Sequence, residues 1–532
     1  MPQRGECRAD VSLLGGEFAF VLWDETRSRI VAGRDRFGVK PLVYSEQGDN
    51  LLIASESKAL FALGVRAEWD HDSLDHAFTH QYLPPQRTLF RGIEALAPGH
   101  LLIATQRGAA RVRRYWDLDL PSSEAASDDE EASRVVRAGL EEAVRLRVRA
   151  DVPLAFHLSG GLDSASILAL AARASASPLH AFTVGFRHPP YDETELARRV
   201  AAALGITLHV VDVNQELILD ALSDAVFYGE GLCINGQLPS KLVLARAIAA
   251  RGFKVALSGE GSDEAFLGYA HLAQDHALAT AGEQAGSAPL AHADLAQLGV
   301  MLPEANAPAL PEVRRILGHV PTFLTAKAAF GLRLRSLLSD EAHGPATAAR
   351  TFERLFASLD IGQLQGRPPV LQSSYLWTRL ALAGYILRTL GDGTEMAASV
   401  EGRTPFLDHV LFERVRALPV SVKLRDGIQK YALREAVRDL LPSSVLARRK
   451  HPFLAPPITL FHSTRTREYV LDLLTGTALR RLPLVDAGKV QRFAEQCFQR
   501  DDGGGNTAEP ILMTLLSACC LQERFNLAEG GR

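Results

Sequence analysis

The sequence predicts an α/β protein with a β-rich N-terminal region, followed by a larger parallel-sheet region with added helices. In the first 120 residues several short stretches alternate apolar and polar side chains, as at 17–24. From residue 152 onward, short apolar strands alternate with helices of about ten residues, a pattern typical of a sheet covered on both faces. At 532 residues the chain also exceeds the roughly 250–300 residues that one hydrophobic core can hold.

In the N-terminal region, extended stretches at 17–24, 29–33 and 51–54 predict hairpin strands. The segment 121–133 is polar and acidic and has no large apolar side chain, so it cannot contribute to a core. We therefore expect a partial N-terminal domain over 1–120, a linker over 121–133 and a second domain over 134–532.

The second domain begins with a predicted helix at 134–149. Its strands and helices then alternate, with predicted strands at 152–158, 179–186, 206–213 and 254–257 and predicted helices at 164–173, 194–204 and 240–250. Ligands bind beyond the carboxyl ends of the strands in such sheets. The segments that follow Leu158 and Leu257 are therefore the first places to look for a site. After residue 270, Ala- and Leu-rich sequence predicts helices packed beside the sheet.

Composition narrows the function classes. A net charge of −4 without a basic cluster argues against a nucleic-acid partner. No apolar run approaches the roughly 18 residues of a membrane span, and the N-terminus lacks the pattern of a signal peptide, so we expect a cytoplasmic protein. Five scattered cysteines without a CxxC pair suggest neither disulfides nor a zinc site. Small-molecule chemistry is the better expectation.

The first candidate site is the run Ser159-Gly160-Gly161-Leu162-Asp163-Ser164, directly after the first core strand. Glycines allow close backbone approach, and the start of a helix presents unpaired N–H groups, so the loop should hold an anion. Asp163 fits such a loop if a Mg²⁺ ion bridges its carboxylate and phosphate oxygens. The structural alternative is a tight strand-to-helix turn in which a serine caps the helix.

The second candidate site is the segment 258–264, Ser-Gly-Glu-Gly-Ser-Asp-Glu, at the end of a later strand. Its three carboxylates, Glu260, Asp263 and Glu264, would repel one another unless a cation or a basic substrate offsets them. A solvated acidic turn is the alternative. We favour the functional interpretation because both segments fall at the same edge of the predicted sheet.

These two segments resemble the SGGxDS and SGEGxDE motifs of the asparagine synthetase family, and the first is similar to the PP-loop of ATP pyrophosphatases. Further resemblance lies, in the same order as in that family, at 395–409, 430–435 and 448–453. Several motifs in the right order are far more specific than one. The resemblance implies a PP-loop synthetase domain of the adenine nucleotide alpha hydrolase-like fold.

The resemblance also implies roles for individual residues. Asp163 and Asp263 would hold Mg²⁺ on the pyrophosphate of ATP, and Glu260 would act as a general base or electrostatic partner when ammonia attacks the adenylate. Lys450 would neutralise charge on the leaving pyrophosphate, the alternative being an ordinary lysine on a helix surface. The remaining ATP or pyrophosphate contacts would come from Leu158, Ser159, Gly160, Gly161, Ser164, Val184, Ser258 and Gly259.

Two positions bear on the substrate. The β-lactam synthetases, which resemble this domain but close a ring, carry Tyr where this chain has Glu260, so intermolecular amide formation is favoured. Related chains commonly read Asp-Arg-Met where this one reads Asp392-Gly393-Thr394. If that Arg grips the acceptor carboxylate, the acceptor differs from aspartate.

Residues 13–58 resemble the back half of a class II glutamine amidotransferase domain, with motifs at 33–42 and 54–60. This implies a partial Ntn-hydrolase-like fold, whose nucleophile is an N-terminal cysteine. Here Pro2 follows Met1, and Cys7 is internal. We therefore expect no glutaminase activity as the sequence stands. Either an upstream segment is missing, which we favour, or the enzyme takes free ammonia or another amine. A partial β layer should also leave an unpaired sheet edge.

The sequence thus predicts an ATP-dependent amide-forming ligase that activates aspartate or an analogous acid as acyl-AMP and amidates it with ammonia. The alternatives are a secondary-metabolite amidotransferase, a β-lactam or peptide-cyclising synthetase on the same scaffold, and a non-catalytic relic. Expected ligands are ATP, Mg²⁺, a small carboxylate, and ammonia or glutamine. By analogy with the family, we also expect a homodimer.

Overall fold

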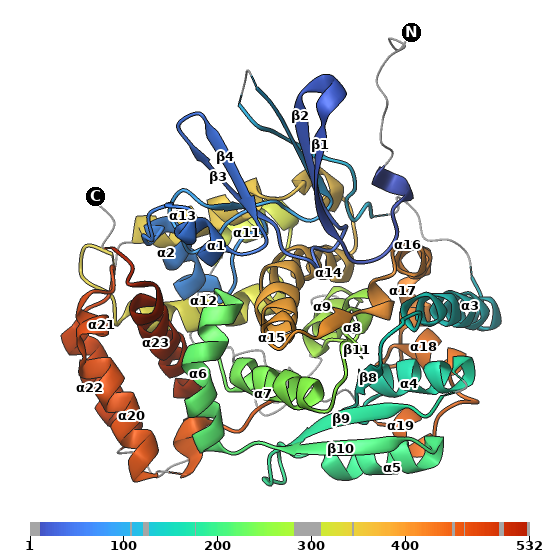
Figure 1. Cartoon of the computed structure of the whole chain (residues 1–532). Helices are drawn as coiled ribbons and strands as arrows, with labels where there is room; N and C mark the ends of the chain where they lie inside the picture. Colours follow the sequence, from blue (N-terminus) through green and yellow to red (C-terminus); the bar gives the residue numbers. More distant parts are fainter. Residues whose placement is uncertain are drawn as a thin grey trace.

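The computed structural model describes residues 11–106, 109–120, 127–175, 177–280, 310–342, 345–448, 453–461, 463–498 and 505–528. Its N-terminal part holds two small antiparallel sheets, whose hairpins lie at the top of Figure 1. One sheet has the order β1-β2-β6-β7, with strands Ala19–Asp24, Arg29–Arg34, His100–Thr105 and Arg111–Arg114. The other has the order β4-β3-β5, with strands Asn50–Ala54, Val43–Gln47 and Glu94–Ala95.

Strand β1 forms an open edge of the first sheet, as the sequence predicts. Within the described residues, β1 pairs only with β2. Its consecutive residues Val21, Leu22 and Trp23 are all about half exposed. Neighbouring residues of a strand point to opposite faces, so both faces of this hairpin lack a full apolar cover.

The larger part is built on a parallel sheet of order β10-β9-β8-β11-β12, with strands Thr207–Asp212, His180–Gly185, Leu154–His157, Val255–Leu257 and Glu401–Arg403. The four strands expected from the sequence are confirmed, as are helices α4 (Leu162–Ala174), α5 (Thr194–Leu204) and α7 (Gln237–Ala250). Strands β8 and β11 are neighbours, with Ala155 opposite Ala256. Their carboxyl ends therefore bring the two candidate segments to one edge of the sheet.

The first helix of this part differs from the sequence expectation. Helix α3 spans Asp129–Arg147, whereas a helix at 134–149 was expected. The Asp128 side chain accepts a hydrogen bond from Glu131 N and caps the helix, and acidic residues fill its first turn, where the helix dipole favours them. The end of the predicted linker is therefore helical, while 121–126 lie outside the described residues. The division into domains remains a prediction.

Helices make up most of the chain after residue 270, as expected. The helices not yet named include α1 (Ser57–Ala62), α2 (His71–His80), α6 (Gln215–Gly229), α8 (Ser262–Ala265), α9 (Ala270–Thr280), α11 (Pro311–Leu317), α12 (Thr322–Arg335), α13 (Pro345–Ala357), α14 (Pro369–Trp377), the π-helix η4 (Thr378–Asp392), α15 (Gly393–Ala397), α16 (His409–Ala417), α17 (Val420–Lys423), α18 (Tyr431–Ala436), α19 (Ser443–Leu446), α20 (Thr464–Thr475), α21 (Thr477–Arg480), α22 (Ala487–Cys497) and α23 (Gly505–Phe525). Of these, α1, α2, α6 and α8 were not predicted from the sequence. No helix in the described ranges has both the length and the apolar character to cross a membrane.

The N-terminal sheets are fixed to the larger part through the two segments that resemble amidotransferase motifs. The carboxylate of Glu230, at the end of α6, accepts hydrogen bonds of 2.8 Å from the backbone N–H groups of both Ser57 and Lys58. Lys40 Nζ donates to Asp392 Oδ1 at 2.8 Å. One continuous apolar core runs from Phe37 to the C-terminal helix. The N-terminal part is thus placed against the helices that surround the candidate site.

Candidate functional site

The glycine-rich loop after β8 is shaped as an anion cradle. Gly160 has φ +75°, and a Cβ there would lie 2.7 Å from Leu196 Cγ and 2.8 Å from Ala197 N, so only glycine fits. Ser159 Oγ accepts from Gly161 N at 3.3 Å and lies 3.3 Å from Ser164 Oγ. The backbone N–H groups at the start of the 13-residue helix α4 follow directly. The loop therefore combines a glycine in the left-handed region, two serine hydroxyls and a helix N-terminus, which together suit the binding of phosphate.

The two aspartates predicted to share a metal meet around one lysine. Lys430 Nζ lies 2.6 Å from Asp163 Oδ1 and 2.6 Å from Asp263 Oδ1. Ser262 Oγ donates to Asp163 Oδ1 at 2.8 Å. Lys430 is almost fully buried, and Gly268 lies so close to it that an added Cβ would collide with Lys430 Cε. The carboxylates from two neighbouring strand ends therefore point at a common position that already attracts a cation.

The donor set at this position suits a hard divalent cation. Two carboxylate oxygens from Asp163 and Asp263 converge beside the phosphate cradle, and Mg²⁺ prefers oxygen ligands and usually keeps waters and substrate phosphates in its shell. Across the described ranges no group of three or more His, Cys, Asp or Glu side chains forms a self-sufficient metal cage. The arrangement thus fits an ion that arrives with a polyphosphate.

Glu260 faces the same cavity and is paired with Lys241 of α7, whose Nζ donates to Glu260 Oε1 at 2.8 Å. Burial by itself would lower the pKa of Lys241, but the charge of Glu260, the hydrogen bond to it and the charge of Glu395 together raise that pKa above its ordinary value. Beneath this pair, burial lowers the pKa of His157 to about 4 and raises the pKa of Glu395 to about 7. The Lys241 ammonium is therefore firmly charged and keeps Glu260 oriented.

A cavity of about 290 Å³ joins these groups. Its walls include most of the predicted site residues: Leu158, Ser159, Asp163, Ser164, Val184, Ser258, Gly259, Glu260 and Asp263. Gly160 and Gly161 belong to the loop that forms the phosphate cradle. Lys450 lies outside the described residues, so its predicted role stays a prediction. Phe453, three positions later, lines the cavity.

Sequence reasoning gave no role to Lys430, which lies between the two aspartates, or to the lysines and aromatic residues that line the cavity. Lys430 is the first residue of the motif at 430–435, and this position could have identified it as a site residue from the sequence. Lys241 and Lys327 are single lysines within helices α7 and α12 and carry no local signature. The same holds for the aromatic wall, which gathers Tyr82, Tyr269, Trp377 and Tyr385 from three separate stretches of chain.

Comparison with known proteins gives matches over both parts of the chain. A family model described as asparagine synthase matches residues 135–521, and one described as a glutamine amidotransferase domain matches residues 4–116. The chain is 32% identical to amidase chyE of Penicillium rubens, over 98% of this chain and 81% of the relative. It is 31% identical to amidase chry2 of Gibberella zeae, over 97% and 80%. It is 29% identical to glutamine-hydrolyzing asparagine synthetase 3 of Bacillus subtilis, over 83% and 68%.

Proposed function

Because the chain belongs to the asparagine synthase family, we propose that it is an ATP-dependent, amide-forming carbon–nitrogen ligase. It activates a small-molecule carboxylate as an acyl-adenylate with release of pyrophosphate, and then transfers nitrogen to the acyl carbon. The observation that carries this proposal is the meeting of Asp163 and Asp263 beside the phosphate cradle. A non-catalytic relic would not need to retain two largely buried carboxylates beside the loop.

In the first step, a carboxylate oxygen of the acceptor attacks the α-phosphorus of ATP, and the bond from that phosphorus to the bridging oxygen of pyrophosphate breaks. The cradle formed by Ser159, Gly161 and Ser164 binds and orients the phosphates. Asp163 and Asp263 would hold Mg²⁺, which offsets phosphate charge when bound. Leu158 and Val184 offer an apolar wall for the adenine.

In the second step, the ammonia nitrogen attacks the acyl carbon, the bond from that carbon to AMP breaks, and a proton leaves the nitrogen. The attacking nitrogen gains positive charge as the new bond forms. The carboxylate of Glu260, oriented by Lys241, stabilises that charge and can accept the proton. Ammonia is the nitrogen donor that the second step requires.

The acceptor acid need not be aspartate. Two relatives aligned over nearly the whole chain bear the name amidase rather than asparagine synthetase. In addition, Asp392 of the divergent Asp392-Gly393-Thr394 stretch pairs with Lys40, so its charge serves the contact with the N-terminal part. The relatives' name favours an acceptor other than aspartate.

The decisive experiment is acid-dependent exchange of labelled pyrophosphate into ATP, measured with a panel of carboxylic acids including aspartate. Amide formation is then followed with ammonium chloride and with glutamine as alternative donors. Exchange that depends on one acid, followed by amide formation with ammonia, is the expected result. ATP binding without exchange or hydrolysis for any acid would favour the relic.

We expect Glu260→Gln to separate the two steps. Pyrophosphate exchange should stay within a few-fold of wild type, because the phosphate cradle is intact. Amide release should fall by about 10²–10⁴-fold, the usual contribution of a positioned acid–base group. Rapid-quench measurement of adenylate and amide would resolve the steps, with the exposed Glu312→Gln as a matched control. Equal losses in both steps would contradict the role given to Glu260.

A further inference from the structure

Lys327 is a buried cation in the wall of the cavity and has no carboxylate partner. Lys327 lies on α12 and is only 4% exposed. Its ammonium donates a hydrogen bond to the amide oxygen of Gln81. In the described part of the chain, no carboxylate lies within ion-pair distance of it. A buried charge normally costs several kcal/mol unless it is paired. An uncompensated ammonium at a cavity wall therefore points to an anionic ligand.

The neighbouring side chains of His80, Gln81 and His271 carry no negative charge that could pair with the Lys327 ammonium. Burial lowers the pKa of His271 to about 3 and holds the pKa of His80 well below its ordinary value, so both rings are neutral. Gln81, the C-cap of α2, is a neutral amide. Burial alone lowers the pKa of Lys327 to about 8, which still leaves most of the ammonium charged at neutral pH.

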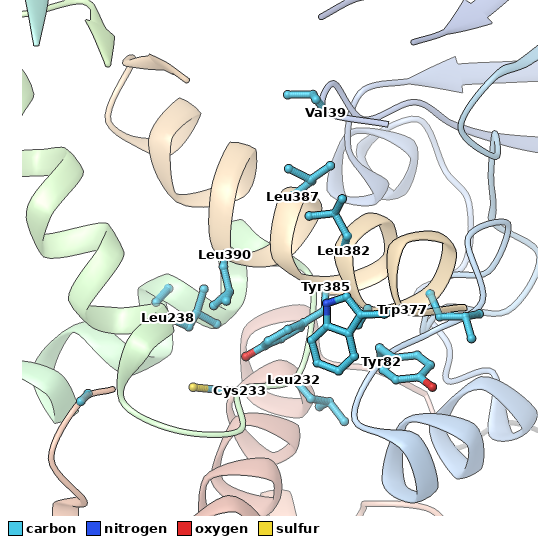
Figure 2. Packing of buried hydrophobic residues seen from close by; sticks show 14 of the residues in the cluster. Val39, Tyr82, Leu232, Cys233, Leu238, Trp377, Leu382, Tyr385, Leu387 and Leu390 are labelled. Carbon is cyan, nitrogen blue, oxygen red and sulfur yellow. The ribbon is translucent and has the colours of Figure 1, made fainter. Parts of the chain in front are cut away.

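Aromatic rings form the adjoining wall. Tyr269 and Trp377 lie with ring centroids 4.9 Å apart, and their polar atoms both donate to Glu264, at 2.9 and 3.2 Å. Their remaining ring atoms are therefore available to line the cavity. Tyr82 and Tyr385 line it as well, and Figure 2 shows Trp377 between these two tyrosines. Such a wall favours a flat apolar ligand.

We propose that this half of the cavity is the acceptor subsite and that it takes an aromatic carboxylic acid bearing a second anionic group, which pairs with Lys327. The inference rests on the proposed ligase function and names its substrate class. The reacting carboxylate then lies toward Glu260 and the phosphate cradle, in the same cavity. Aspartate also has a second carboxylate, but it has no ring to pack against the aromatic wall, and it brings an α-ammonium group of the same charge as Lys327.

The test compares isophthalate, benzoate and aspartate as probes in pyrophosphate exchange. We expect kcat/KM for isophthalate to exceed that for benzoate and for aspartate by at least 10-fold, since a charge-assisted pair in a dry site is strong. Binding is measured separately, as the rise in melting temperature caused by each acid in the presence of a non-hydrolysable ATP analogue. Isophthalate should give the largest rise.

Variants at Lys327 tie this preference to the ammonium. Lys327→Met should remove the advantage of isophthalate over benzoate while leaving the KM for ATP within about two-fold, and Lys327→Arg should retain part of it. The exposed Lys254→Met is the matched control. Lys327→Met should also melt no lower than wild type, because it removes an unpaired buried charge. A lysine that merely supports the fold would instead leave the acid preference unchanged and lower the melting temperature.

The results of these experiments distinguish failure of the subsite assignment from failure of the proposed ligase function. If aspartate supports exchange best and Lys327→Met does not alter the order of acids, the subsite assignment is wrong and the ligase function stands. If isophthalate neither raises the melting temperature nor supports exchange beyond aspartate, the assignment fails as well. If the protein binds ATP but no acid supports exchange, the proposed function itself falls.

Discussion

Asp163→Asn is expected to lower acid-dependent pyrophosphate exchange by at least about 10³-fold, since charge stabilisation dominates phosphoryl and adenylyl transfer. The substitution keeps the size and hydrogen-bonding capacity of the side chain but removes one of two carboxylate charges directed at the shared cation position. It also leaves the Ser262 hydroxyl with an amide oxygen to donate to. The loss should therefore reflect charge rather than packing.

The matched control is Asp151→Asn, at an exposed position three residues before β8. Its exchange rate should equal that of wild type. Raising the Mg²⁺ concentration should recover part of the activity of Asp163→Asn, because Asp263 still supplies one oxygen ligand. If Asp163→Asn exchanges pyrophosphate as fast as wild type at ordinary Mg²⁺ concentration, the metal does not bind at this edge of the sheet. The adenylation step would then have to be placed elsewhere as well.

Strand periodicity and loop composition were enough to predict the centre of the fold. Strands β8 to β11 and the two motif loops follow from apolar runs, from glycines and from the rule that parallel strands end at one edge. Strand β12 could not be predicted this way, because Glu401–Arg403 is three residues long and polar at both ends. Its place in the sheet is set by pairing with β11, a contact across more than a hundred residues of sequence.

Some residues of the candidate site could likewise be predicted from the sequence, and others could not. Residues on one loop, such as Ser159 and Asp163, are detectable because their spacing is local. Lys327 and Trp377 become site residues only when α12 and α14 fold to form part of the cavity wall, and their neighbours in sequence do not mark them. The start of α3 was misplaced for a different reason. The acidic run over 128–131 was interpreted as linker composition, although the Asp128 side chain caps a helix by accepting from Glu131 N.

Lys430→Met is expected to change stability and metal affinity in opposite directions. Without the ammonium, Asp163 and Asp263 face each other with two negative charges in a largely buried site. Removing one partner from a buried ion pair typically costs about 3–5 kcal/mol. Urea denaturation in EDTA should therefore give a free energy of unfolding that is lower by about that amount, while Lys254→Met changes it by less than about 0.5 kcal/mol.

The same substitution should strengthen Mg²⁺ binding in the absence of ATP, because the ammonium and the ion compete for the same carboxylate oxygens. A cation that binds only the folded state stabilises it by RT ln(1 + [Mg²⁺]/Kd), so added Mg²⁺ should restore more stability to Lys430→Met than to wild type. Titration calorimetry would measure the affinity directly. If Mg²⁺ stabilises both proteins equally, the ammonium and the ion occupy different positions, and Lys430 serves the fold rather than holding the carboxylates together until the nucleotide arrives.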